Sequence, residues 1–263
     1  MMKELSAALE ERARPEGLAW LREASAAVAA EPPAIRSRFP MVGRKVGRGP
    51  LHAGDSPDDV HAWTVDDAAR TLLLLAAGEA AEGELAELYR YGDAAERRGI
   101  LRALPYLGIG DRGLYLVDDA IRTNDTRLIA AALGPYATEH LSDAAYDQAM
   151  LKCVFVGVPI TPLDGIPARV TPDGARMLAA LVHERVAAGR DVPAEVWTVI
   201  DKYPHADEIA AIEAELKSPF EDRRAAAERA LSHRNQGGQP LRPTPSIRNQ
   251  GEQPHRPTPI IRP

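Results

Sequence analysis

The residues with the clearest potential for chemistry lie in two predicted helices. Lys152 stands in a stretch, residues 150–156, that is otherwise apolar on most sides. Burial would lower the pKa of its amine, which could then act as a base or as a Schiff-base nucleophile. The alternative is an amine that stays in water while its stem covers apolar surface. His183 and Glu184 would transfer protons in a polar cleft, or would lie on a solvated helix side.

Cationic side chains near these groups suggest an anionic substrate. Arg176 lies seven residues before His183 and therefore on the same helical face, and Arg185 follows Glu184. A basic run in an irregular stretch could bind the anion, and it contains Arg44, Lys45 and Arg48. Together with the candidate catalytic set Lys152, His183 and Glu184, these residues would fit an isomerase or lyase acting on a small polyol or sugar phosphate.

Other motifs lack the secondary structure or the spacing that their usual function requires. Gly108, Gly110 and Gly113 have dinucleotide-site spacing, but they follow a predicted helix end rather than a strand, which indicates a helix-to-helix turn. Asp118 and Asp119 are adjacent, whereas paired acids on one helical face need a separation of three or four residues. No zinc spacing or Ser-His-Asp set is present, so we expect no metal and no cofactor.

Composition excludes several classes of protein. The 263 residues carry a net charge of −6, and the segment from residue 234 onward has five arginines and one glutamate, so about −10 falls on the rest. Such an acidic body repels nucleic acid, and 5% aromatic residues offer few surfaces for base stacking. The apolar runs are too short to span a membrane, no secretory signal is evident, and Cys153 has no disulfide partner. We expect Cys153 to be a core residue and the protein to be cytoplasmic.

Helical periodicity and capping patterns extend over most of residues 1–233, and strand patterns are nearly absent. Capping pairs are expected at Thr64 with Asp67 and at Asp93 with Glu96, and helix starts at Thr171-Pro172 and Ser218-Pro219. The prediction is an all-α fold of stacked antiparallel helix pairs, a HEAT-like α-solenoid or a bundle. Predicted helices cover residues 3–14, 15–30, 64–77, 82–91, 93–104, 111–123, 125–133, 142–156, 172–188, 193–202, 206–217 and 219–232, and residues 32–58 are expected to be a long loop.

The last thirty residues, 234–263, contain a tandem repeat. Residues 234–247 read RNQGGQPLRPTPSI, and residues 248–261 read RNQGEQPHRPTPII. This composition predicts a disordered, proline-rich tail. It would be a meaningless duplication, a ligand shown to a partner, or a peptide that another enzyme modifies while the helical body serves as its leader. The residues expected to be recognised or modified are Arg242, Pro243, Thr244, Pro245, Arg256, Pro257, Thr258 and Pro259.

Several ordered blocks of the body resemble the EboA family. They are VGRKVGRGPL (42–51), RTND (122–125), GPYATEHLSDAAYDQAMLKCVFVGVPI (134–160) and ARMLAALVHERVAAGRDVPAEVW (175–197). The resemblance implies a helical-repeat protein of bacterial gene clusters for specialised metabolites, whose biochemical role is not established. It also implies a groove formed by Arg44, Gly47, Arg122, Thr123, Asn124, Pro135, Tyr136, Gln148, Lys152, Gly157, Pro159, Arg176, His183, Glu184 and Arg185.

Two positions depart from the family pattern, because Asp147 and Gly134 stand where asparagines are expected. Asp147 is included with the groove residues as a candidate for binding. The hypothesis from these observations is a non-catalytic binding and carrier protein. Its body would dock a biosynthetic or modifying enzyme encoded nearby, and its tail would be presented to that enzyme. The isomerase or lyase is the alternative.

Overall fold

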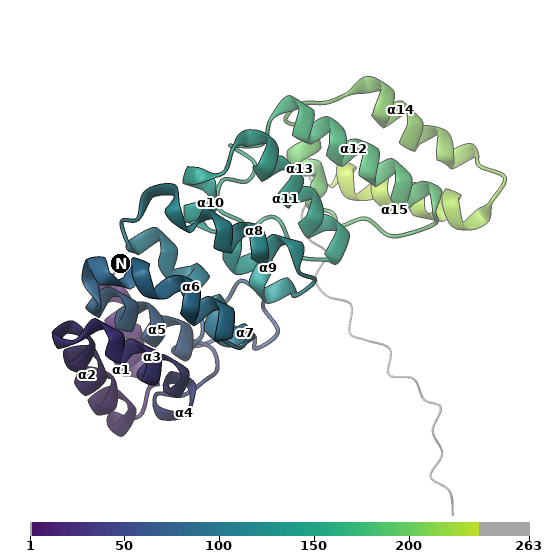
Figure 1. The fold of residues 1–263 in the computed structure, drawn as a ribbon. Coiled ribbons are helices and arrows are strands. Elements are labelled where there is room, and N and C mark those ends of the chain that lie inside the picture. The colour runs from purple at the N-terminus through teal and green to yellow at the C-terminus, as the bar shows by residue number, and fades with distance from the viewer. Residues whose placement is uncertain (1, 237–263) are drawn as a thin grey trace, which may run out of the picture.

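The computed structural model describes residues 2–236 (Figure 1). All its regular elements in that range are helices, which confirms the predicted all-α class. The tail lies outside the described residues from residue 237 onward, and the predicted start of the tail at residue 234 falls within the end of the last helix. The α-helices are α1 Met2–Arg12, α2 Pro15–Ala30, α3 Ile35–Arg38, α4 Val42–Lys45, α5 Val65–Ala76, α6 Ala81–Tyr91, α7 Ala94–Ala103, α8 Leu114–Arg122, α9 Thr126–Ala132, α10 Pro135–His140, α11 Asp143–Val156, α12 Pro172–Ala187, α13 Val196–Ile200, α14 Ala206–Ala214 and α15 Glu221–Asn235.

Short 3-10 turns connect several of these helices. They are η1 Pro32–Ala34, η2 Phe39–Met41, η3 Gly78–Ala80, η4 Leu104–Tyr106, η5 Gly110–Gly113 and η6 Glu215–Lys217. Gly108, which has a φ of 64°, precedes η5, so the glycine-rich segment is the predicted helix-to-helix turn. In the part of the chain that the structure describes, no helix is both long and apolar enough to cross a lipid bilayer.

Three of the four helix starts predicted from capping patterns are confirmed. Reciprocal capping boxes join Thr64 with Asp67 at α5 and Asp93 with Glu96 at α7, and the Thr171 hydroxyl accepts from the backbone at the start of α12. The predicted start at Ser218 and Pro219 is wrong. Helix α15 begins two residues later at Glu221, with no side-chain cap at its first turn.

The predicted long loop over residues 32–58 is wrong in its first half. Residues 32–45 form a run of short helical turns from η1 to α4, and only the segment after them is irregular. The run is helical because Ile35, Phe39 and Val42, spaced by four and three residues, are all fully buried. The many proline and basic residues in this segment are typical of a loop, so the sequence did not indicate a helix there. The short helix α10 was also absent from the prediction.

The helices pack in sequence along an elongated body, with α1 to α5 at one end and α12 to α15 at the other (Figure 1). Helix α5 packs on α1, α2, α4 and α7; α7 packs on α9, α9 on α8 and α11, α11 on α12, and α12 on α13, α14 and α15. Buried apolar side chains form one connected core through these contacts. The relation to HEAT-like solenoids stays a prediction.

Candidate functional site

Residues 60–64, here called the wall segment, separate two pockets in the middle of the molecule. Val60, Ala62 and Thr64 line one pocket, while His61 and Trp63 line the other. Alternate residues of the segment therefore line opposite pockets, and its first two residues lie in a turn that the N–H of Ala62 closes on the carbonyl of Asp59. Each pocket obtains one side of its lining from the same five residues.

Arg102 on α7 holds the wall segment by its backbone. Its guanidinium donates hydrogen bonds to the carbonyl oxygens of Val60, His61 and Ala62, at 3.3, 3.1 and 2.9 Å. It also lies 5.2 Å from the centre of the Trp63 ring. Burial lowers the pKa of Arg102, and the nearby carboxylate of Asp67 opposes that shift. The positive charge of Arg102 is thus used for structure rather than offered to a ligand.

Asp67 is the shared counter-ion beneath the wall segment. It is fully buried, and its two oxygens lie 2.9 and 3.0 Å from Nε of Arg98. Nε of Arg102 lies 3.3 Å from the same carboxylate, and Arg98 also donates to the hydroxyl of Thr64 at 3.0 Å. One carboxylate therefore fixes two arginines of α7 and, through them, the wall segment.

A second buried ion pair lies on the same turn of α5. Arg70, which is fully buried, donates to Asp66 at 2.6 Å and lies 5.5 Å from the Phe39 ring centre. Gly99 on α7 leaves room for it, because a Cβ there would lie 2.8 Å from Cδ of Arg70. Three buried arginines thus face two buried aspartates at the contact of α5 with α7.

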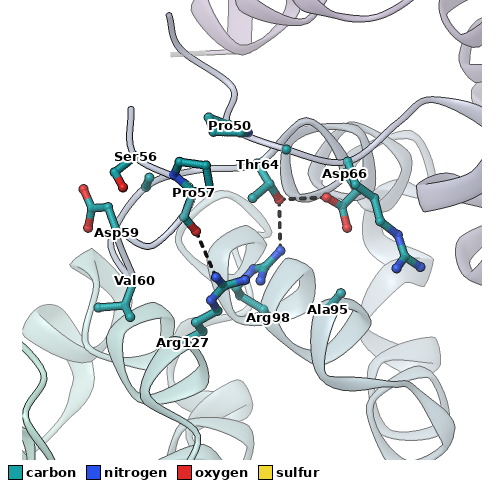
Figure 2. A pocket seen from close by; sticks show the side chains of 13 residues that line it. Pro50, Ser56, Pro57, Asp59, Val60, Thr64, Asp66, Ala95, Arg98 and Arg127 are labelled. Carbon is teal, nitrogen blue, oxygen red and sulfur yellow. Dashed lines mark hydrogen bonds between the residues drawn. The ribbon is translucent and has the colours of Figure 1, made fainter. Parts of the chain in front are cut away.

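The first pocket, here called the arginine pocket, has a volume of about 270 Å³ (Figure 2). Arg48, Arg98 and Arg127 reach it from the segment after α4, from α7 and from α9. Figure 2 shows Thr64 bonded to both Asp66 and Arg98, and Arg127 bonded to the carbonyl of Pro57. Its other lining residues are Gly49, Pro50, Ser56, Asp59, Val60, Ala62 and Ala95.

Two of these arginines are available to a ligand. Arg48 and Arg127 are exposed, and among residues 2–236 neither forms an ion pair. Arg98 is neutralised by Asp67, and Asp66 is held by Arg70. The pocket is close to the small end of ligand sites, with proline and aliphatic walls beside two guanidinium groups. This combination suits a small anion that carries an apolar part.

The second pocket, here called the aromatic cleft, has a volume of about 310 Å³. Nε2 of His61 donates to the carbonyl oxygen of Pro159 at 2.8 Å, and burial lowers the pKa of His61. The Tyr136 hydroxyl accepts from the backbone N–H of Gly113 and donates to the carbonyl of Gly110. Aromatic, proline and leucine side chains form most of the lining, which comprises His61, Trp63, Leu101, Arg102, Pro105, Tyr106, Ala130, Ala131, Leu133, Gly134, Pro135, Tyr136, Pro162, Leu163 and Asp164.

Two of the predicted site residues, Lys152 and Asn124, are in contact. Nζ of Lys152, which is half-buried, donates to Oδ1 of Asn124 at 2.9 Å. Arg122, two residues before Asn124, is exposed and lines a separate pocket with Tyr115 and Asp119. Lys152 does not line the arginine pocket or the aromatic cleft.

The predicted residues of α12 have partners of their own. Nε2 of His183 lies 3.8 Å from Glu215, and Glu184 is exposed. Arg185 donates to the carbonyl of Asp191, and Arg176 lies 3.9 Å from Asp173. The two pockets described above contain none of the candidate catalytic residues, whose joint role in an isomerase or lyase stays a prediction.

The other predicted binding residues divide between surface and interior. Arg44, Lys45 and Gln148 are exposed, and Arg48 is the member of the basic run that lines the arginine pocket. Asp147 is buried and accepts a 2.5 Å hydrogen bond from the Thr171 hydroxyl. Cys153 is a fully buried core residue as expected, and burial raises the pKa of its thiol to about 12.

Sequence reasoning predicted Arg48 and Tyr136, which line the two pockets, but missed the buried charges on α5 and α7 that hold the wall segment. Arg98 and Arg102 are four residues apart on α7, a pattern that more often marks a solvated helix face. Asp67 was recognised only as a capping residue. The sequence signal for these residues would have been the adjacent acids Asp66 and Asp67 at the start of α5. If that turn is buried, both carboxylates need buried cations as partners. Among the described residues no cluster of three His, Cys, Asp or Glu side chains suits a metal ion.

Comparison with known proteins gives one match. The model of a family described as "Metabolite traffic protein EboA" matches residues 1–201. No curated protein and no solved structure matches the chain. The matched residues include the wall segment and the linings of both pockets, whereas α14, α15 and the tail repeats follow them.

Proposed function

The chain belongs to the EboA family, and on that premise we propose that it is a non-catalytic binding and carrier protein in metabolite traffic. The helical body would bind a small anionic metabolite and dock a partner enzyme that makes or uses it. The C-terminal repeats would be a ligand for that enzyme or a peptide that it modifies. The description of the family supports the link to metabolites.

The arginine pocket is the observation that carries this proposal. Arg48 and Arg127 would bind the carboxylate or phosphate oxygens of the metabolite through charge-assisted hydrogen bonds. Arg98 would add to the positive electrostatic potential of the pocket while it stays paired with Asp67. Pro50 and Val60 would contact the apolar part. A carrier needs a binding pocket of this kind. It does not need an acid, a base or a nucleophile that points into the pocket.

The distribution of reactive side chains supports a non-catalytic role. Lys152 is bonded to Asn124, and His183 lies beside Glu215 on a different part of the body. Cys153 is buried with a raised thiol pKa, which removes the thiolate that a cysteine nucleophile requires.

The tandem repeat supports a second contact with the partner. Two copies of one peptide raise its effective concentration at a partner's groove. Mass spectrometry of residues 234–263 after co-expression with enzymes encoded nearby tests this part. An unmodified tail that can also be deleted without loss of partner binding would exclude it.

The anion site is tested by removing its two available charges. In the double variant Arg48→Gln with Arg127→Gln, we expect at least a tenfold weaker binding of inorganic pyrophosphate, measured by isothermal titration calorimetry. A hydrogen bond to a charged group contributes about 1.5–3 kcal/mol, so the loss of two such contacts accounts for this factor. The matched control is Arg44→Gln with Lys45→Gln, which removes two exposed charges outside the pocket and should change the affinity less than about twofold. Equal weakening in both double variants would show a general surface charge effect and refute the site.

A further inference from the structure

The aromatic cleft has the features of a groove that recognises proline-rich peptides. The rings of Trp63 and Tyr106 are partly exposed in it, beside Pro105 and Pro162. Grooves lined by aromatic rings bind extended Pro-x-Pro segments, whose backbone is already close to its bound geometry. The guanidinium of Arg102 is occupied by three carbonyl groups of the wall segment, so the cleft offers apolar surface rather than an anion site.

One edge of the cleft carries an acidic group. Asp164 is exposed, and its carboxylate forms no ion pair within the described part of the chain. Its position is fixed through its backbone, because its carbonyl accepts hydrogen bonds from the hydroxyls of Thr138 and Tyr146. A peptide with an arginine next to its prolines would place that arginine against Asp164.

The chain carries such a peptide twice. Residues 242–245 and 256–259 both read Arg-Pro-Thr-Pro, which is a Pro-x-Pro unit with an arginine directly before it. We propose that the aromatic cleft binds one of these two segments from the same chain. The docked copy would be withheld from a partner until that partner competes for it, while the other copy stays available.

A series of contacts links the end of the described chain to the segment that carries Asp164. Near the end of α15, Arg234 pairs with Asp201 at 2.9 Å, and the adjacent Lys202 donates to the carbonyls of Pro167 and Ala168. Asp164 lies only three residues before Pro167 and lines the cleft. Arg242 of the first Arg-Pro-Thr-Pro unit is six residues beyond position 236, a span of up to roughly 20 Å, and Arg256 of the second unit is twenty residues beyond it, up to roughly 65 Å.

Charge and tethering both favour docking within one chain. Residues 234–263 hold five arginines and one glutamate, whereas the rest of the chain has a net charge of about −10. A short tether gives effective concentrations on the order of millimolar, so even a weak groove is occupied. This contact does not depend on the anion site, because the two pockets lie on opposite sides of the wall segment.

Photo-crosslinking in the full chain tests the contact. p-Benzoylphenylalanine replaces Tyr106 in the cleft or, as the control, Tyr115, which is 50% exposed and lines a different pocket. After irradiation, we expect adducts to peptides from residues 237–263 at the monomer mass, with about tenfold higher yield from position 106. The combined variant Pro243→Ala, Pro245→Ala, Pro257→Ala and Pro259→Ala should abolish the excess, and Asp164→Asn should reduce it.

Three results would overturn the proposal: equal yields from both positions, adducts that persist in the proline variant, or dimeric adducts whose yield rises with concentration. If the replacement of Tyr106 prevents folding, as judged by circular dichroism, the exposed Pro162 at the same cleft is the second crosslinker position. The double variant Arg48→Gln with Arg127→Gln should keep the adducts, which separates failure of this contact from failure of the anion site.

Discussion

Asp67→Asn is expected to lower the free energy of unfolding by about 3–5 kcal/mol, because two buried arginines lose their shared counter-charge. Asp67 is fully buried between Arg98 and Arg102, and its size is nearly unchanged by the substitution. The effect is therefore electrostatic rather than a loss of packing. The same carboxylate also caps α5 by accepting from the backbone N–H of Thr64, which adds to the loss.

Urea denaturation at neutral pH measures this effect. The matched control is Asp173→Asn, whose side chain is 87% exposed next to Arg176 and whose loss should cost less than about 0.5 kcal/mol. A decrease below about 1 kcal/mol for Asp67→Asn would mean that Arg98 and Arg102 do not need this carboxylate. The wall segment would then have to be held in another way.

Gly174→Ala is the second large effect, with an expected loss of about 3 kcal/mol. A Cβ at position 174 would lie 2.3 Å from both Cγ and Oδ1 of Asp147, and this buried carboxylate is bonded to Thr171 at the start of α12. Relief of the clash would displace the carboxylate or the first turn of α12. Overpacking costs roughly 1–3 kcal/mol, and a lost buried hydrogen bond adds a similar amount.

Gly83→Ala is the control for Gly174→Ala, because it makes the same chemical change in helix α6 with no atom within 4 Å of the new Cβ. It should stabilise the protein by roughly 0.5–1 kcal/mol, since alanine is the better helix former. The two substitutions should therefore change the free energy of unfolding in opposite directions in the same denaturation experiment. A stabilising Gly174→Ala would contradict the close contact between α11 and α12.

Local sequence signals predicted most of the helices because their causes are local. The capping boxes at Thr64 and Asp93 each need only residues within one turn, and both form as expected. The failures occurred where tertiary packing decides. Ile35, Phe39 and Val42 make residues 32–45 helical by burial, although proline and basic residues there are typical of a loop.

The candidate site could be predicted only in part. Arg48 was identified because a basic run in an irregular segment suggests anion binding, and it lines the arginine pocket. Arg127 and Arg98 come from helices that are distant in sequence, so no local pattern connects them with Arg48. The apolar neighbours of Lys152 suggest a buried amine, but its amine donates a hydrogen bond to the side chain of Asn124. Whether a side chain reaches a polar partner depends on tertiary structure.

Native mass spectrometry of the full chain, purified from the cells that make it, tests most directly whether the body carries an anionic metabolite. We predict a small anionic molecule bound to the wild type and to the control variant Arg44→Gln with Lys45→Gln, and absent from Arg48→Gln with Arg127→Gln. The released molecule should have the same mass before and after incubation with fresh protein. A molecule retained equally by all three proteins, or one that the protein converts, would contradict the proposed carrier function.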